Sequence, residues 1–74
     1  MTKPIAISTE YITLGQFLKL SDCISSGGAA KPFLQEQSVL VNNEAEARRG
    51  RKLYPTDIVE VEGYGSFVVI GGEE

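Results

Sequence analysis

The stretch that decides the fold of this 74-residue chain is TLGQFLKLSDCISSGGAAK, residues 13–31. Thr13 can cap a helix, and Gln16 stands three residues later, where it completes a capping box. The apolar residues that follow share one helical face: Leu14, Phe17, Leu18 and Ile24, with Leu20 and Cys23 at its margin. We expect this helix to end at residues 25–28, because glycine tolerates the left-handed conformation that closes a helix.

A second, shorter helix is predicted from about Ala29 to Gln37. Its apolar residues are spaced for one buried face: Ala29, Ala30, Phe33 and Leu34. Pro32 is tolerated in a first helical turn but not in a helix interior. The second helix must therefore begin close to Gly28.

Strands are predicted on both sides of the helices, beginning with a short one at Pro4 to Ser8. The later segments alternate between strands and turns: Val39–Val41, a tight turn at Asn42-Asn43, a weakly patterned arm from Glu44 to Ala47, a turn at Tyr54–Asp57, the strand Ile58–Glu62, a turn at Gly63–Gly65 and the strand Ser66–Ile70. The last two strands form a hairpin. The acids of the first of them, Glu60 and Glu62, lie on its solvent side.

Composition argues against most hydrolase and metalloenzyme classes. The chain has no histidine, so the usual general base and the commonest transition-metal ligand are missing. Cys23 is the only cysteine, which rules out an intramolecular disulfide and a cysteine-rich zinc site. We see no catalytic residues and expect no metal or cofactor. Without a signal peptide or a long apolar run, a cytoplasmic location with no membrane contact is expected.

Positive charge is concentrated in one run, Arg48-Arg49-Gly50-Arg51-Lys52, which holds four of the seven cations of a chain with net charge −3. One interpretation is a solvated loop that protects a sheet edge against aggregation. The other is an anion site. Three arginines favour the second, because the planar guanidinium suits bidentate contacts with phosphate.

A second clue comes from Lys31, because a cation in the first turn of a helix opposes the helix dipole by about 0.3–1 kcal/mol. The preceding Ser26-Gly27-Gly28 offers backbone N–H groups that a phosphate can approach closely. The alternative is a simple turn between helices, with Lys31 in water. Tyr54, beside the basic run, is a candidate for stacking on a base, unless it packs into the core. Tyr64, between two glycines, could also stack on a base or could cover the apolar face of its own hairpin.

The order and spacing of several motifs resemble the S-four RNA-binding domain, in particular its compact stand-alone bacterial branch, the YaaA type. The resemblance covers roughly residues 12 to 70. The motifs are Leu14–Lys19, Ser26–Lys31, Val39–Glu44, Arg48–Lys52 and Asp57–Val59. One departure is Gly27-Gly28, where many domains of the wider family have a serine-arginine pair.

This resemblance implies an α+β fold in a single domain, residues 1–74, with two short helices, arranged like a helix-turn-helix, packed on a small, mostly antiparallel sheet. It also implies a non-enzymatic protein that binds structured RNA, either ribosomal or transfer RNA, with the ribosome as a further expected partner. We expect a monomer without a small-molecule substrate. The implied RNA-binding residues are Ser26, Gly27, Gly28, Lys31, Arg48, Arg49, Arg51 and Lys52.

Two other functions stay open. The ending Phe67–Gly72 resembles the Gly-Gly tail of small β-grasp sulfur-carrier proteins, but Glu73-Glu74 would have to be removed to free the glycine carboxylate. A β-grasp fold also opens with a β-hairpin, which fits the predicted helices poorly. The third possibility is an adaptor that binds a protein through the acidic strand face.

Overall fold

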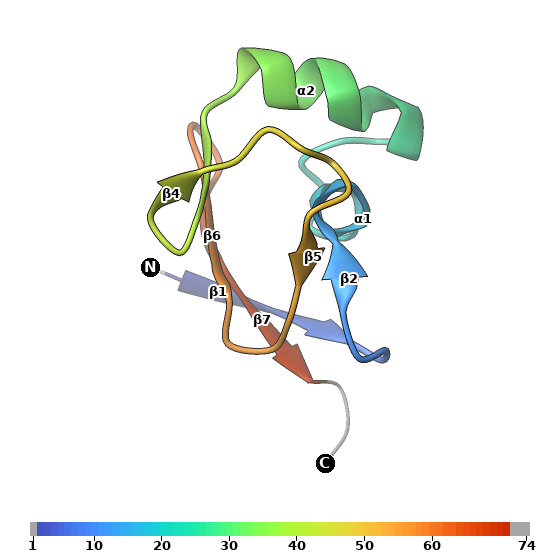
Figure 1. Cartoon of the computed structure of the whole chain (residues 1–74), viewed down its shortest axis with the longest axis vertical. Coiled ribbons are helices and arrows are strands. Elements are labelled where there is room, and N and C mark those ends of the chain that lie inside the picture. The colour runs from blue at the N-terminus through green and yellow to red at the C-terminus, as the bar shows by residue number, and fades with distance from the viewer. Residues whose placement is uncertain (1, 72–74) are drawn as a thin grey trace.

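The computed structural model describes residues 2–71, which fold into two helices and two sheets (Figure 1). In chain order the elements are β1 (Thr2–Ile7), β2 (Ile12–Thr13), α1 (Leu14–Leu20), the 3-10 helix η1 (Gly27–Ala29), α2 (Ala30–Glu36), β3 (Val39–Val41), β4 (Glu44–Ala45), β5 (Lys52–Leu53), β6 (Ile58–Val61) and β7 (Gly65–Gly71). The larger sheet has the strand order β1-β7-β6-β3-β4, and β2 pairs with β5 in a separate ribbon. The predicted α+β class is confirmed.

The larger sheet is antiparallel except at one edge, where β1 runs parallel to β7. The pairing extends from Thr2 opposite Ser66 to Ile7 opposite Gly71. The prediction of a first strand at Pro4 to Ser8 was therefore wrong by two residues at its start. The local pattern could not show this, because β7, more than 60 positions away in the chain, determines where β1 begins.

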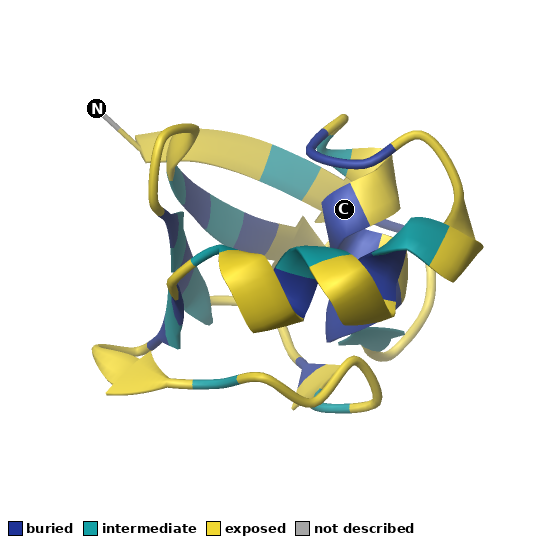
Figure 2. Cartoon of the chain, turned by 90° about the horizontal axis from the view of Figure 1, so that it is seen from above, coloured by how far each residue is buried: buried dark blue, intermediate teal, exposed yellow. Residues whose placement is uncertain are grey.

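The core lies between the helices and one face of the larger sheet (Figure 2). Alternation places one set of side chains of β3, β6 and β7 on the inner face: Val39, Val41, Val59, Val61, Phe67 and Val69. From the helices they meet Leu14, Phe17, Leu18, Ala30 and Leu34. Phe17 and Phe67 pack edge to face with ring centroids 5.9 Å apart. Most of the apolar residues predicted for the two helical faces are thus buried, whereas Ala29 and Phe33 are partly buried and Leu20 is 50% exposed.

The first helix begins as predicted but ends earlier. The capping box is present, with the Gln16 N–H donating to Thr13 Oγ1 and the Thr13 N–H to Gln16 Oε1, each at 3.4 Å. The expected end at residues 25–28 is wrong, because Asp22 takes the left-handed conformation, with φ of 67°, only two residues after the helix ends at Leu20. The N–H groups of Cys23 and Ile24 then bond to the Leu18 carbonyl, which buries both side chains outside the helix.

The second helical segment begins close to the predicted position, with η1 leading directly into α2. Pro32 is the third residue of α2, within the first turn, as the sequence required. Gly27 and Gly28 do not terminate a helix; they form the start of η1.

The turns confirm the predictions made from Asn42-Asn43 and Gly63–Gly65. Asn42 and Asn43 have φ of 52° and 71°, which lets a two-residue turn join β3 and β4. The Asn42 side chain accepts a hydrogen bond from the Ile58 N–H at 2.9 Å and donates to Asp57 at 3.1 Å. This network joins the β3–β4 turn to the predicted turn at residues 54–57, which follows β5.

Candidate nucleic-acid interface

The basic loop, residues 48–52, is docked on the N-terminus of α1. The Leu14 N–H donates to the Arg51 carbonyl and the Gly15 N–H to the Arg49 carbonyl, both at 2.8 Å. These two N–H groups belong to the first turn of a helix, where no carbonyl of the same helix can accept them. Figure 1 shows the segment between β4 and β5 passing beside α1. The loop backbone is therefore held in place by the helix rather than extended freely into water.

Gly15 makes this close contact possible. A Cβ atom at this position would lie 3.3 Å from Arg49 Cβ and 3.4 Å from Ala30 Cβ, tighter than ordinary van der Waals contact. Gly15 thus lies where α1, α2 and the basic loop meet. From the sequence, Gly15 belongs to a motif but has no assigned role, because the residues that require a glycine there are distant along the chain.

Glu46 organises two of the four cations of the basic loop. Its carboxylate accepts Arg48 Nε at 2.9 Å and Arg48 Nη2 at 3.2 Å, and it accepts Arg51 Nη1 at 2.9 Å. The Glu46 side chain is only 8% exposed. Hydrogen bonds from Arg48, assisted by Arg51, lower the pKa of Glu46 from its ordinary 4.5 to about 2. Sequence reasoning missed Glu46, because the arm from Glu44 to Ala47 has too weak a pattern to indicate a partner.

The other two cations of the loop have different surroundings. Within residues 2–71, neither Arg49 nor Lys52 forms an ion pair with a carboxylate. The Nζ atom of Lys52 lies 5.0 Å from the centre of the Tyr11 ring. The basic run predicted as a uniform cluster is therefore divided into two arginines held by Glu46 and two cations available to a ligand.

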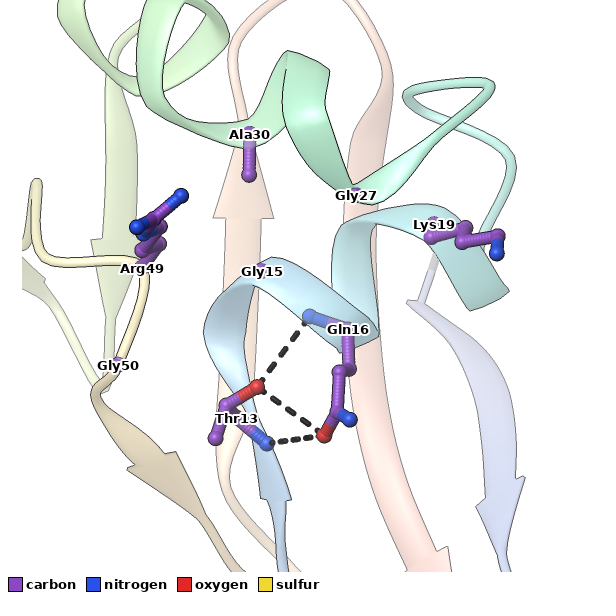
Figure 3. Close-up of a pocket in the computed structure, with 8 residues that line it drawn as sticks. All are labelled: Thr13, Gly15, Gln16, Lys19, Gly27, Ala30, Arg49 and Gly50. Atoms are coloured by element: carbon purple, nitrogen blue, oxygen red, sulfur yellow. Dashed lines mark hydrogen bonds between the residues drawn. The ribbon is translucent and has the colours of Figure 1, made fainter.

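A hollow of about 430 Å³ opens where α1, η1 and the basic loop meet (Figure 3). We call it the Arg49 hollow. It is lined by Thr13, Gly15, Gln16, Lys19, Gly27, Ala30, Arg49 and Gly50. Figure 3 shows Arg49 on one side of Gly15 and Lys19 on the other. Two cations thus flank a concave surface whose floor is formed by small residues, an arrangement suited to a phosphate group.

The hollow brings together one residue from each predicted half of the interface, Gly27 and Arg49. Ser26, Gly28 and Lys31 are exposed but do not line it. Lys31 lies in the first turn of α2, as expected. Lys19 lines the hollow but was not predicted as a site residue. It follows Gln16 by three residues, and this spacing indicates that the two side chains share the exposed face of α1.

The two tyrosines singled out from the sequence have different environments. Tyr54 is 45% exposed, so its alternative assignment to the core is wrong. Its ring lies 5.8 Å from that of Tyr11. Tyr64 is also 45% exposed but packs against Phe33 of α2, with ring centroids 5.6 Å apart. Tyr54 therefore remains a candidate for stacking beside the basic loop, whereas Tyr64 covers a helix.

Neither a metal cluster nor a membrane-spanning helix is found in the described part of the chain. Residues 2–71 hold no group of three histidine, cysteine, aspartate or glutamate side chains that could bind a metal ion. No helix among these residues is long and apolar enough to cross a bilayer.

Comparison with known sequences identifies the class of protein that this fold and interface represent. The S4 domain family matches residues 5–70, nearly the whole chain, and the chain belongs to this family. It is 66% identical over 70 residues to the probable ribosome maturation protein RlbA of Bacillus subtilis, covering 95% of this chain and 99% of that protein. The resemblance noted in the sequence is thereby confirmed.

The family assignment overturns the sulfur-carrier alternative as far as the fold is concerned. That alternative required an opening β-hairpin, but β1 and β2 belong to different sheets, and β1 pairs with the last strand. The Gly72 carboxylate on which the sulfur chemistry would depend lies outside the described residues.

Proposed function

We propose that this protein is a non-enzymatic module that binds structured RNA, with ribosomal RNA as the target and a role in ribosome maturation. The S4 domain family match and the name of the B. subtilis relative support the class of target. A ribosomal RNA target also agrees with the cytoplasmic location expected from the sequence. Transfer RNA is the second target expected from the sequence, and no feature of the structure favours it.

The observation that carries the proposal is the Arg49 hollow. It joins a cation from the basic loop, a cation from α1 and the backbone at the start of η1 around one concave surface. RNA phosphates bind through such charged and backbone donors, and these contacts supply much of the affinity. In this arrangement Arg49 and Lys19 neutralise phosphate directly, and Lys31 contacts the neighbouring backbone from the exposed side of α2.

Arg48 and Arg51 play a supporting part in this proposal. Their ion pairs with Glu46 fix the shape of the loop that presents Arg49. Replacing all three arginines together would also remove the ion pairs through which Glu46 orders the loop. Such a variant would lose stability as well as RNA contacts, and so a single substitution at Arg49 is the sharper test.

Arg49→Gln should weaken binding to a structured ribosomal RNA fragment by about tenfold, because one charged phosphate contact is lost. Fluorescence anisotropy at fixed salt measures the change. The matched control is Lys3→Gln, which removes one positive charge from β1 in the larger sheet, outside the Arg49 hollow.

Equal losses in the Arg49→Gln and Lys3→Gln variants would mean that total charge, and not the hollow, governs binding. A wild-type protein that binds no structured RNA at low salt would refute the proposed function itself.

A further inference from the structure

The ribbon formed by β2 and β5 presents aromatic side chains to solvent next to the Arg49 hollow. Ile12 pairs with Leu53, and Thr13 pairs with Lys52. Leu53 is fully buried, so its side of the ribbon faces the core. Alternation along each strand places the neighbouring side chains, those of Tyr11, Thr13, Lys52 and Tyr54, on the opposite, outward side.

Tyr11 and Tyr54 form an exposed pair on this outward side. The two residues are 39% and 45% exposed, and their ring centroids lie 5.8 Å apart at an interplanar angle of 46°. Lys52 Nζ lies 5.0 Å from the centre of the Tyr11 ring. Both residues are exposed among residues 2–71, and neither packs on a helix as Tyr64 packs on Phe33 of α2. Two aromatic faces and a cation therefore stand together in water.

The aromatic pair and the hollow form one continuous surface. Thr13 lines the hollow, and its partner across the ribbon is Lys52. The next pair along the ribbon, away from the hollow, is Ile12 with Leu53, and Tyr11 and Tyr54 follow that pair. A nucleic-acid strand that leaves the hollow along the ribbon meets Lys52 first and the tyrosine rings next.

We propose that Tyr11 and Tyr54, with Lys52, form a stacking platform for an unpaired base of the RNA whose phosphates occupy the Arg49 hollow. This inference rests on the proposed function and specifies its substrate: a structured RNA with an unpaired nucleotide beside its helix. Aromatic side chains recognise bases that are splayed out of a helix, because every base has a π face. Lys52 contacts the phosphate of the same nucleotide.

The platform discriminates unpaired from paired nucleotides without reading the sequence. Bases inside a duplex are stacked on one another and leave no face for a tyrosine ring. Stacking on an aromatic side chain strengthens binding by a factor of roughly ten per base. We therefore expect an RNA hairpin with a three-nucleotide single-stranded flank to bind about tenfold more tightly than the same hairpin with a blunt end.

The test compares the binding of these two hairpins to the wild type and to four variants by fluorescence anisotropy. The double variant Tyr11→Leu/Tyr54→Leu should lose the preference for the flanked hairpin, whereas Tyr11→Phe/Tyr54→Phe should keep it, because the rings remain. Tyr64→Leu is the matched control, since Tyr64 is as exposed as Tyr54 but lies against α2. Arg49→Gln should weaken binding to both hairpins by the same factor and leave their ratio unchanged.

A second readout does not depend on removing any platform ring. The chain contains three tyrosines and no tryptophan, so in Tyr64→Phe only Tyr11 and Tyr54 emit tyrosine fluorescence. The flanked hairpin should quench this emission more strongly than the blunt one at saturation.

The outcomes separate this inference from the proposed function. Equal binding of both hairpins by the wild type, a preference that survives in the leucine double variant, or equal quenching would overturn the stacking platform while leaving RNA binding intact. Binding of neither hairpin by the wild type would overturn both.

Discussion

A single carboxylate, that of Glu46, shapes the loop that carries most of the positive charge. It accepts three hydrogen bonds from Arg48 and Arg51 side chains and one from the Arg48 N–H at 3.0 Å. Charge-assisted bonds of this kind have a defined geometry, so they restrict the loop more than electrostatic attraction alone would. Arg48 is 77% exposed, and the contribution of its pair to stability is limited by water.

The pH dependence of stability should reveal this role of Glu46. Because its pKa falls from 4.5 to about 2 on folding, its ion pairs stabilise the protein above pH 4.5, and this contribution disappears as the pH falls toward 2. Glu46→Gln should lower the free energy of unfolding by about 1 kcal/mol at pH 6 and by only a small fraction of that at pH 2, where the contribution of the ion pairs is nearly lost. Urea unfolding at a series of pH values measures the difference.

The control for this measurement is Glu44→Gln, an exposed acid of the same arm that forms no ion pair among residues 2–71. Its stability should stay within about 0.5 kcal/mol of the wild type at every pH. A Glu46→Gln effect as large at pH 2 as at pH 6 would mean that side-chain packing, and not charge, explains the loss.

At the scale of elements, α1 and the basic loop stabilise each other. The loop supplies carbonyl acceptors for N–H groups of the first turn of α1, and α1 supplies the donors that order the loop. The capping box at Thr13 and Gln16 satisfies further groups at the same helix end. The position of Arg49 is thus determined by how closely the loop can approach α1.

Gly15→Ala tests that approach. The added methyl group would meet Arg49 and Ala30 at 3.3–3.4 Å, so the loop or α2 must move by a few tenths of an ångström. Gly28→Ala is the matched control, because nothing lies within 4 Å of a Cβ atom there. We expect Gly15→Ala to be about 1 kcal/mol less stable than Gly28→Ala in thermal unfolding. Equal stabilities would show that the loop adapts to the methyl group without cost.

At the scale of the whole molecule, charge is separated between surfaces. The chain is acidic overall, with net charge −3, although four cations lie in the basic loop. Glu60, on β6, and Glu62, just after it, lie apart from the Arg49 hollow and the tyrosine platform. Acids elsewhere repel RNA, which restricts productive docking to the surface that carries the cations.

The salt dependence of RNA binding reports how many cations of the protein contact phosphates. Four of them, Lys19, Lys31, Arg49 and Lys52, form no ion pair within residues 2–71. If each neutralises one phosphate, log K against log salt concentration should have a slope of about −3. Titrations at four or more salt concentrations measure it. A slope near zero would contradict phosphate binding, and one near −5 would mean that Arg48 and Arg51 leave Glu46 for the RNA.

The sequence by itself determined the features that depend on neighbours along the chain. The capping box at Thr13, the first-turn position of Pro32 and the left-handed turn at Asn42-Asn43 follow from side chains within a few residues of one another. The alternation of β6 and β7 likewise identified the hairpin and its buried face. These signals located most of the helices and strands, and the resemblance to the S4 domain gave the α+β fold. The candidate interface came from the basic run and from Lys31 behind Gly27-Gly28.

Only the tertiary structure decided which distant groups meet. The parallel pairing of β1 with β7, the contact of Gly15 with Arg49 and the exposed pair of Tyr11 and Tyr54 join residues more than 30 positions apart. Glu46 lies close to its arginines in sequence, but their contact requires the loop to fold back onto α1. Local propensity carries no information on such long-range contacts, because they depend on the packing of all elements around one core.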